Sequence, residues 1–368
     1  MRLGITVDSI APNLTGIGRY TWELCRGLAQ TGEVEDLAYF RQDRWIRDPS
    51  DLLAGRHLRR SRLSRAVRDF RARRGFRDRL IHGTNYFLPD MTEAGVVTVH
   101  DMSIFLYPET HPAERVGEFE RRFAQSLRRA GHIITDSHAT RNDFIAQFSY
   151  APERVTTVHL GVSRRFQPQS GFALRVDLKR IFGCDIGDYI LSVATFEPRK
   201  RIESAILAHA QFCDRTRSTI PLVLVGAKGW VNDALHRLID TEKARGRLIM
   251  LGFVDDTDLP TLYAGAKLFV YPSIYEGFGL PPIEAKACGT PVIVSNRSCL
   301  PEVTRGAAMT VDPDDLEALA AMMEQGLQDD NWREAAISAG LAVAADYSWE
   351  QCIDRTVDVY RMCGASAG

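Results

Sequence analysis

The sequence predicts an α/β protein made of two Rossmann-like, doubly wound domains that face each other across a cleft. The chain has 368 residues, which are too many for one ordinary domain and suit two. Short runs rich in β-branched residues alternate with longer helical patterns from end to end, as is typical of parallel sheets with helices on both faces. Roughly a dozen strands follow from this reading, too many for one open sheet.

The expected strands are short and apolar, and helical patterns lie between them. Strands are expected at 2–7, 95–99, 132–135, 155–158, 189–194, 222–225, 248–251, 267–271 and 291–294. Helices are expected at 17–30, 112–130, 201–214, 257–266 and 280–288. A last helix is expected from about Ser348, because Trp349, Ile353, Val357 and Tyr360 recur at helical spacing.

The boundary between the domains is expected within 163–187, where the stretch SRRFQPQSGF loses periodicity before a fresh buried strand. This places the first domain at 1–168 and the second at 169–347. The terminal helix at 348–368 could pack back on the first domain or belong to the second.

Composition excludes several classes of protein. The net charge is −1 with 25% charged residues, so a basic nucleic-acid-binding chain is not expected. The seven cysteines are an odd number with no close pairs, which predicts reduced, mostly buried thiols and no zinc site. No apolar run approaches the ~20 residues that span a bilayer, and the start MRLGITVDS lacks a signal peptide, so a cytoplasmic location is expected.

One segment departs from this even balance. Residues 56–79 hold eleven arginines and two aspartates, a local charge of +9 that leaves −10 for the rest of the chain. Leu63, Ala66, Val67 and Phe70 fall on one helical stripe, so a basic amphipathic helix bound to anionic headgroups is one interpretation. The alternative is an ordinary helix that packs this narrow stripe on its own sheet.

Polar residues follow the predicted strands, where ligands of such sheets bind. Gly16 and Gly18, in NLTGIGRYT, precede a helix expected to begin at Tyr20 and could bring amides near a phosphate, or form a plain tight turn. His100 ends the strand 95–99 and could bond a polar ligand or transfer a proton. The alternative for His100 is a structural histidine bonded to a carbonyl.

Two cations stand near the start of the helix expected at 201–214. Arg199 and Lys200 are unusual there, because a helix N-terminus prefers anions. A bound diphosphate would resolve the conflict by supplying negative charge to both. The alternative is a pair of solvated side chains.

The stretch 271–295 reads as a strand, a glycine-rich turn, a helix and a second strand. Glu276 precedes Gly277-Phe278-Gly279, and Glu284 lies eight residues further on. Eight helical residues would separate the two carboxylates by ~12 Å, more than the ~5–5.5 Å of a retaining glycosidase pair. Separate ligand contacts are therefore expected for the two glutamates.

A second acidic motif, Asp256-Thr257-Asp258, could suggest a metal-dependent transferase. It precedes the helical pattern LPTLYAGA, so helix capping and compensation of the helix dipole are the preferred explanation. No metal site and no cofactor are expected.

The block EGFGLPPIEA begins with Glu276 and has Glu284 as its last residue but one, and it resembles the signature of the retaining glycosyltransferases of family 4, which have the GT-B fold. GIGRYT, VHD at 99–101, FEPRK and LGFVDDTDLPTLYAGA match the family in order over nearly the whole chain. The resemblance is greatest to bacterial mannosyltransferases of O-antigens and exopolysaccharides.

The resemblance implies that the domain at 1–168 is the acceptor-side domain, that the domain at 169–347 binds the nucleotide sugar, and that particular residues have defined roles. Glu284 would bond the donor ribose, Glu276 the donor sugar, and Arg199 and Lys200 the diphosphate, with His100 beside the sugar. The implied catalytic residues are Glu276, His100, Arg199 and Lys200; the implied donor-binding residues are Gly18, Arg199, Lys200, Val254, Gly277, Phe278, Gly279, Leu280 and Glu284. Some relatives carry a further arginine at the position of Ala194, so phosphate neutralisation here would depend more on Arg199 and Lys200.

The implied activity is retaining, metal-independent transfer of a hexose, with mannose from GDP-mannose as the first choice, to a lipid-linked or oligosaccharide acceptor in cell-surface polysaccharide synthesis. The enzyme would work at the inner face of the cytoplasmic membrane. UDP-sugar donors and a GT-B sugar-nucleotide epimerase stay open. A nicotinamide dehydrogenase is disfavoured by the incomplete glycine fingerprint, and a non-catalytic binding protein by the full set of polar contacts.

Overall fold

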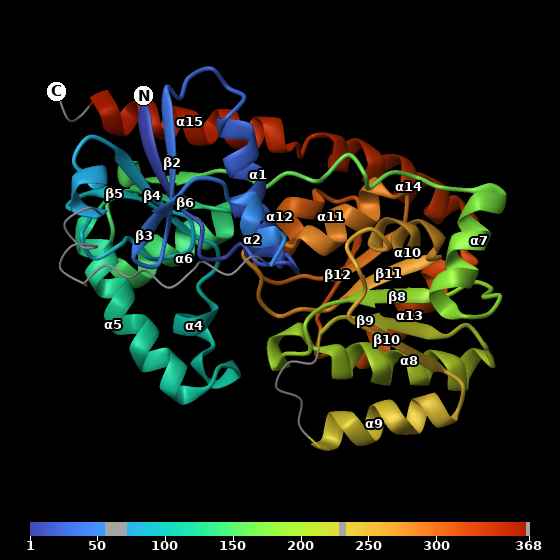
Figure 1. The fold of residues 1–368 in the computed structure, drawn as a ribbon. Coiled ribbons are helices and arrows are strands. Elements are labelled where there is room, and N and C mark those ends of the chain that lie inside the picture. Colours follow the sequence, from blue (N-terminus) through green and yellow to red (C-terminus); the bar gives the residue numbers. More distant parts are fainter. Residues whose placement is uncertain (56–71, 228–232, 366–368) are drawn as a thin grey trace. The chain divides into compact units, whose positions relative to one another are not determined.

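The computed structural model describes residues 1–55, 72–227 and 233–365, and it separates into two compact units. One unit comprises 1–161 with 348–368, and the other comprises 162–347 (Figure 1). Each unit has its own sheet with helices around it, so the α/β class with two doubly wound domains is confirmed. Among the described residues, no helix combines the length and the apolar character needed to cross a membrane.

The N-terminal unit is built on a seven-stranded sheet in the order β3-β2-β1-β4-β5-β6-β7, in which only β3 runs antiparallel to its neighbour. Its strands are β1 (Arg2–Thr6), β2 (Asp36–Arg41), β3 (Arg44–Ile46), β4 (Leu80–Gly83), β5 (Gly95–Val99), β6 (Ala130–Thr135) and β7 (Val155–Thr157). Its helices are α1 (Gly16–Leu28), α2 (Ser50–Leu53), α4 (Ser103–Leu106), α5 (Ala113–Arg129), α6 (His138–Phe148) and α15 (Trp349–Ala365). The last helix, α15, packs on α1 and β6.

The C-terminal unit has a six-stranded parallel sheet in the order β10-β9-β8-β11-β12-β13. Its strands are β8 (Ile190–Val193), β9 (Leu222–Val225), β10 (Leu248–Gly252), β11 (Leu268–Tyr271), β12 (Val292–Ser295) and β13 (Met309–Val311). Its helices are α7 (Gly171–Phe182), α8 (Ile202–Thr216), α9 (Asp233–Ala244), α10 (Leu259–Gly265), α11 (Leu280–Ala287), α12 (Leu300–Thr304), α13 (Leu316–Gln328) and α14 (Asp330–Ala345). Figure 1 shows α8 and α9 on one face of this sheet and α10, α11 and α14 on the other.

Most expected elements are present, and the differences have local causes. Strands β2, β3, β4 and β13 were not expected. Of these, β2 and β3 mix charged, aromatic and half-buried residues at an edge of the sheet, so they lack the apolar run that marked the expected strands. Helix α7 occupies much of the expected domain boundary and was not predicted. Phe172 and Val176 of this helix are exposed, and only Leu178 is buried. A helix with so little buried surface leaves no clear apolar stripe in the sequence.

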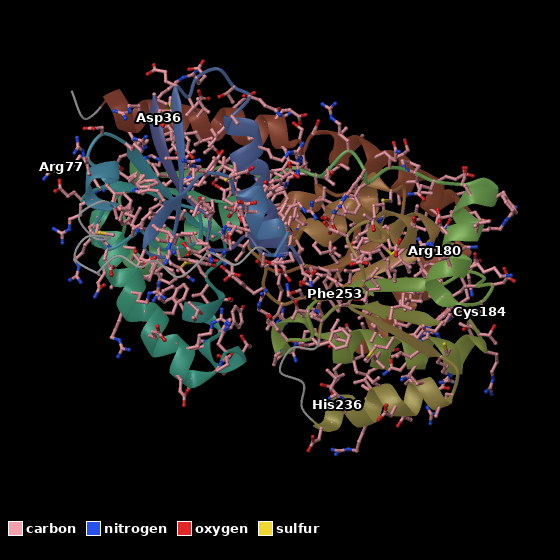
Figure 2. The ribbon with its side chains drawn as sticks, in the orientation of Figure 1. Asp36, Arg77, Arg180, Cys184, His236 and Phe253 are labelled. Atoms are coloured by element: carbon pink, nitrogen blue, oxygen red, sulfur yellow. The ribbon has the colours of Figure 1, made fainter. Side chains whose placement is uncertain are left out.

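The seven cysteines are all free thiols, as predicted from their spacing. Five of them are buried, whereas Cys184 is exposed (Figure 2) and Cys363 is half-buried.

Most of the arginine-rich segment, including its apolar stripe, lies outside the described residues. Of its described end, Ala72 and Phe76 are buried, and the Ala72 carbonyl accepts a hydrogen bond from the Trp45 indole at 3.2 Å. The Phe76 ring packs against Trp45 and Phe40 of the sheet. These contacts show how this end packs, and membrane binding by 56–79 stays a prediction.

Lys286 is a fully buried cation within the C-terminal unit. It lies on α11, is 1% exposed, and donates from Nζ to the carbonyl of Thr304 at 2.9 Å. Helix α14 passes close by at Gly340, where a Cβ would come within 3.3 Å of Lys286 Cγ. Burial lowers the pKa of Lys286 to about 7, because a charged ammonium is poorly solvated there.

The depressed pKa of Lys286 makes stability depend on pH. Between pH 7 and the ordinary lysine pKa, the unfolded chain binds a proton that the folded chain has lost, so the free energy of unfolding rises with pH. We expect an increase of about 1.5 kcal/mol from pH 7 to 8.5, absent in Lys286→Met. Urea unfolding of both proteins at the two pH values measures this difference. An equal change in unfolding free energy with pH in the wild type and in Lys286→Met would contradict the account of a buried ammonium.

Candidate active site

The sheet of the C-terminal unit has a topological switch point between β8 and β11. Strand β8 connects through α8 to β9 on one side, whereas β11 lies on its other side. Ligands of doubly wound sheets bind outside the carboxyl ends of the strands at such a point. The segments that follow β8 and β11 carry Arg199, Lys200 and Glu276, so the sequence-predicted residues gather where the topology places a site.

A buried ion-pair cluster joins these segments. Lys200 Nζ donates to Glu276 Oε1 at 2.5 Å, and Arg199 Nη1 donates to Glu276 Oε2 at 3.2 Å and to the carbonyl of Tyr275 at 2.7 Å. Side-chain exposure is only 11% for each cation and 9% for Glu276. Each carboxylate oxygen of Glu276 therefore has its own cation.

Further protein groups hold the cluster in place. Tyr271, the last residue of β11, donates its hydroxyl to Glu276 Oε1 at 2.8 Å and accepts from Lys200 Nζ at 3.1 Å. Ser298, which follows β12, accepts from the Glu276 amide at 3.0 Å and donates to the Glu276 carbonyl at 2.6 Å. Three strands thus fix the backbone and the carboxylate of Glu276, which is the kind of preorganised support that a binding group needs.

Electrostatics fix the charges in the cluster. Burial by itself would raise the pKa of Glu276, but the attraction of Lys200 and then Arg199 brings it down to about 2. Burial lowers the pKa of Lys200, and the neighbouring Arg199 cation lowers it further. Glu276 is thus a permanent carboxylate at neutral pH, an acceptor of hydrogen bonds that has no proton to give.

The structure shows protein anions beside Arg199 and Lys200, while binding of a diphosphate by these two residues stays a prediction. Both residues lie in a 3₁₀ turn, Pro198–Lys200, ahead of α8, and their charges are met by Glu276 and by Glu197, whose carboxylate is 3.4 Å from Arg199 Nη2. The protein itself supplies the negative charge, because the loop after β11 brings Glu276 to the end of β8.

The glycine-rich turn leads from this cluster into α11. Gly279 has φ +89°, a conformation that favours glycine, and a Cβ there would lie 2.9 Å from Leu300 Cδ2. Pro281 and Pro282, the second and third residues of α11, fit the first turn, where no amide hydrogen is needed, as predicted. Gly277, Phe278, Gly279 and Leu280 therefore lead directly into a helix N-terminus beside Glu276.

Glu284 has a different environment from Glu276. It lies half-buried on α11 and accepts a hydrogen bond from the Tyr263 hydroxyl of α10 at 3.1 Å. The two glutamates therefore belong to different clusters, which agrees with separate ligand contacts. Val254 lies in the loop after β10, and no contact of its side chain assigns it to either cluster.

The side-chain capping bond predicted for the acidic motif at 256–258 is wrong, whereas compensation of the helix dipole by this motif stays a prediction. Asp258 stands at the N-terminus of α10, but its side chain makes no capping bond and pairs with Arg180 of α7 at 2.6 Å. Asp256 pairs with Arg165 at 2.9 Å. Arginines from distant segments of the same unit compensate both carboxylates, a pairing that a local sequence pattern does not reveal.

In the N-terminal unit, helix α1 begins at Gly16, earlier than expected. Gly16 and Gly18 thus lie within its first turn, and the Gly18 amide donates to the hydroxyl of the N-cap Thr15 at 3.4 Å. A Cβ at Gly18 would come within 2.7 Å of the Ser9 carbonyl oxygen. Close packing explains the glycine at position 18, and contact with a phosphate stays a prediction.

His100 directly follows β5 and is 5% exposed. Its Nδ1 is 2.8 Å from Asp136 Oδ2, and its Nε2 is 2.8 Å from the carbonyl oxygen of Thr84. Both ring nitrogens are therefore engaged by the protein, in contrast to the prediction of a side chain free to bond a ligand. The signal for Asp136 was its position directly after the predicted strand 132–135.

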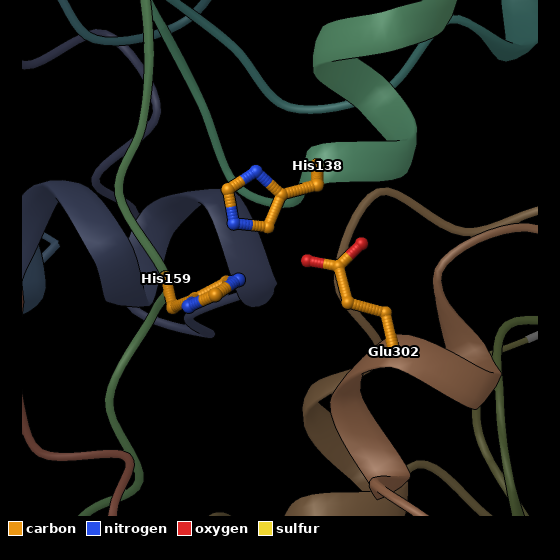
Figure 3. A group of neighbouring side chains, drawn as sticks. All are labelled: His138, His159 and Glu302. Carbon is orange, nitrogen blue, oxygen red and sulfur yellow. The ribbon is translucent and has the colours of Figure 1, made fainter.

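Two more histidines gather near α6 of the same unit. Figure 3 shows His138 at the start of α6 and His159 in the chain after β7. Their ring centroids are 5.4 Å apart, and the ring planes meet at 87°. Glu302, also drawn, belongs to α12 of the C-terminal unit.

The chain matches family models and known proteins over most of its length. A family model described as Glycosyltransferase Family 4 matches residues 14–166, and one described as Glycosyl transferases group 1 matches 186–342. The chain is 39% identical to the O-antigen chain mannosyltransferase B of Escherichia coli, over 98% of this chain and 100% of that protein. This chain belongs to the family 4 glycosyltransferases. The enzyme is thus a glycosyltransferase, and binding of a nucleotide-sugar donor follows from its family.

Other similarities agree with this assignment. The glycosyltransferase is 32% identical to the serotype-specific mannosyltransferase WbdA of Escherichia coli, over 69% of this chain and 32% of that longer protein. Among solved structures, a sucrose-phosphate synthase from Thermosynechococcus elongatus matches with a TM-score of 0.76 and 22% identity over 100% of both chains. That likeness shows the fold, which is GT-B.

Proposed function

We propose that this glycosyltransferase moves mannose from GDP-mannose, with retention and without a metal, to a lipid-linked or oligosaccharide acceptor in O-antigen synthesis. The observation that carries the proposal is the buried Lys200–Glu276–Arg199 cluster at the switch point of the C-terminal sheet. The choice of mannose and of an O-antigen acceptor is supported by the full-length relative, which is named an O-antigen chain mannosyltransferase.

The donor roles divide between the two glutamate clusters. Glu284 accepts hydrogen bonds from the ribose hydroxyls, and the backbone amides of Gly277, Phe278 and Gly279 bind sugar and phosphate at the start of α11. Arg199 and Lys200 bind the diphosphate. In the free enzyme, Glu276 and Glu197 are the anions that pair with these two cations. A diphosphate thus takes over cations that are already in place, so little reorganisation is needed when the donor binds.

Glu276 acts as a fixed acceptor for hydroxyl groups of the transferred sugar. Its pKa of about 2 keeps it ionised at neutral pH, so it orients the sugar and does not serve as a general acid. The proton of the acceptor hydroxyl passes instead to a phosphate oxygen of the departing diphosphate, and the new glycosidic bond forms on the face from which that group leaves. Lys200 and Arg199 stabilise the negative charge that grows on the leaving diphosphate, the task that a metal ion performs in other transferases.

A panel of nucleotide sugars tests the donor. We expect GDP-mannose to raise the midpoint of thermal unfolding more than UDP-glucose, UDP-galactose or GDP-fucose, because a ligand at 100 times its Kd adds ~2.7 kcal/mol to stability. The shift should persist in EDTA. A larger shift with a UDP sugar would show that the donor is a UDP sugar, and the proposed reaction class would stand. An isomerised nucleotide sugar formed without acceptor would instead indicate an epimerase.

A further inference from the structure

The environment of His100 defines the protons on its ring. Three consecutive strands of the N-terminal sheet, β4, β5 and β6, end at Thr84, His100 and Asp136, and the ring bridges the other two residues at 2.8 Å each. His100 is 5% exposed and Asp136 is 3% exposed. The bridge is therefore shielded from water, and its hydrogen bonds must be satisfied within the protein.

A count of donors and acceptors leads to a doubly protonated ring. The Thr84 carbonyl can only accept, so Nε2 of His100 must carry a hydrogen. When Asp136 is ionised, its carboxylate can only accept, so Nδ1 then carries a hydrogen as well. Burial raises the pKa of Asp136, and the charge of His100 and its hydrogen bond oppose that rise. Burial opposes the charged ring, but the attraction of Asp136 and the hydrogen bonds to Asp136 and Thr84 outweigh it and raise the pKa of His100.

Other titratable groups surround the pair, and they do not change this assignment. The groups are Tyr20 of α1, His82 of β4, Tyr86 after β4, Asp101 next in the chain, and, toward Asp136, His159 and Cys352 of α15. Burial, and to a smaller extent the His100 charge, lowers the pKa of His82 to about 3, so His82 stays neutral at neutral pH. Asp101 adds a second negative charge that favours the cationic ring.

We propose that Asp136 is a positioning residue for transfer: it keeps His100 doubly protonated, so that the ring ties together the carboxyl ends of β4, β5 and β6 and takes no part in proton transfer. Both N–H groups are spent on protein acceptors, and neither nitrogen has a lone pair to act as a base. The backbone after β5 is thereby held rigidly. The effect on transfer rests on the proposed function, whereas the proton assignment does not.

The protonation state can be measured without any assay of activity. In full-length protein labelled with ¹⁵N-histidine, with the His100 signal assigned by its loss in His100→Gln, we expect both ring nitrogens to be protonated at pH 7. In Asp136→Asn the side-chain amide can donate to Nδ1, so the ring should become singly protonated at neutral pH while its contacts are kept. A singly protonated ring in the wild-type enzyme at pH 7 would overturn the inference.

The pH profile of transfer separates a positioning role from a merely structural one. With GDP-mannose and acceptor, Asp136→Asn should lower kcat about tenfold and leave the donor KM within twofold, because a charge-assisted bond is replaced by a neutral one. The loss should be smaller at low pH, where the ring regains its proton, whereas His100→Gln should show no such recovery. A wild-type kcat and pH profile in Asp136→Asn would overturn the positioning role. A protonated ring in an enzyme that uses no donor would contradict only the proposed function.

Discussion

Replacing Lys200 by methionine is expected to lower kcat by about 10²- to 10³-fold, the usual cost of removing one preorganised group that stabilises transition-state charge. Lys200 is 11% exposed and already fixed by Glu276 and Tyr271, so its charge needs no reorganisation when negative charge grows on the diphosphate. The donor KM should change less than kcat, because the charge on the leaving group increases during the reaction.

The matched control is Lys267→Met in the same unit. Lys267 pairs with Asp188 at 2.9 Å at the start of the sheet's strands, away from the cluster, and its loss should leave kcat unchanged. Steady-state kinetics of both variants, with thermal unfolding to verify folding, make the comparison. A Lys200→Met enzyme that retains half or more of wild-type kcat would refute the role of Lys200 in leaving-group stabilisation.

The two glutamates are expected to separate binding from turnover. Glu284→Ala should weaken GDP binding by roughly 10- to 100-fold, the equivalent of the ~1.5–3 kcal/mol of a hydrogen bond to a charged group. Glu276→Gln should bind GDP as tightly as the wild type or more tightly, because the diphosphate no longer competes with a carboxylate for Lys200 and Arg199. Its kcat should nevertheless fall, because the transferred sugar loses a charged acceptor.

Calorimetric titration of GDP into the three proteins measures the first effect, and steady-state kinetics measure the second. Tyr263→Phe is a matched control, since it removes the hydroxyl that holds Glu284 at 3.1 Å and leaves the carboxylate itself. Its effect on GDP affinity should be smaller than that of Glu284→Ala. Equal GDP affinity in the wild type and Glu284→Ala would refute the ribose assignment.

The fold was predictable because local patterns decide it. Buried apolar strands such as β5, β9 and β12 alternate with helices, and the glycine and prolines ahead of α11 mark its start. Helix α7 was not predicted because its apolar residues are largely exposed, so burial and hydrophobicity do not coincide there.

The candidate site was predictable in its residues but not in its pairings. Glu276 and Lys200 stand out because each follows a strand, yet their contact depends on β8 and β11 being neighbours, which is a tertiary fact. The same holds for His100, whose partner Asp136 is supplied by the next strand of the sheet, and for Asp258, which Arg180 neutralises from another helix. A local rule such as helix capping fails where a charged residue from a distant segment pairs with the capping side chain.

The configuration of the product tests the central claim most directly. Wild-type enzyme is incubated in EDTA with GDP-α-mannose and a mannose-terminated oligosaccharide, and the anomeric proton and its one-bond coupling to carbon are recorded by NMR. We expect a new α-linked mannose whose formation is independent of added magnesium. A β-linked product, or transfer that EDTA abolishes and magnesium restores, would contradict retaining, metal-independent transfer by the Lys200–Glu276–Arg199 site.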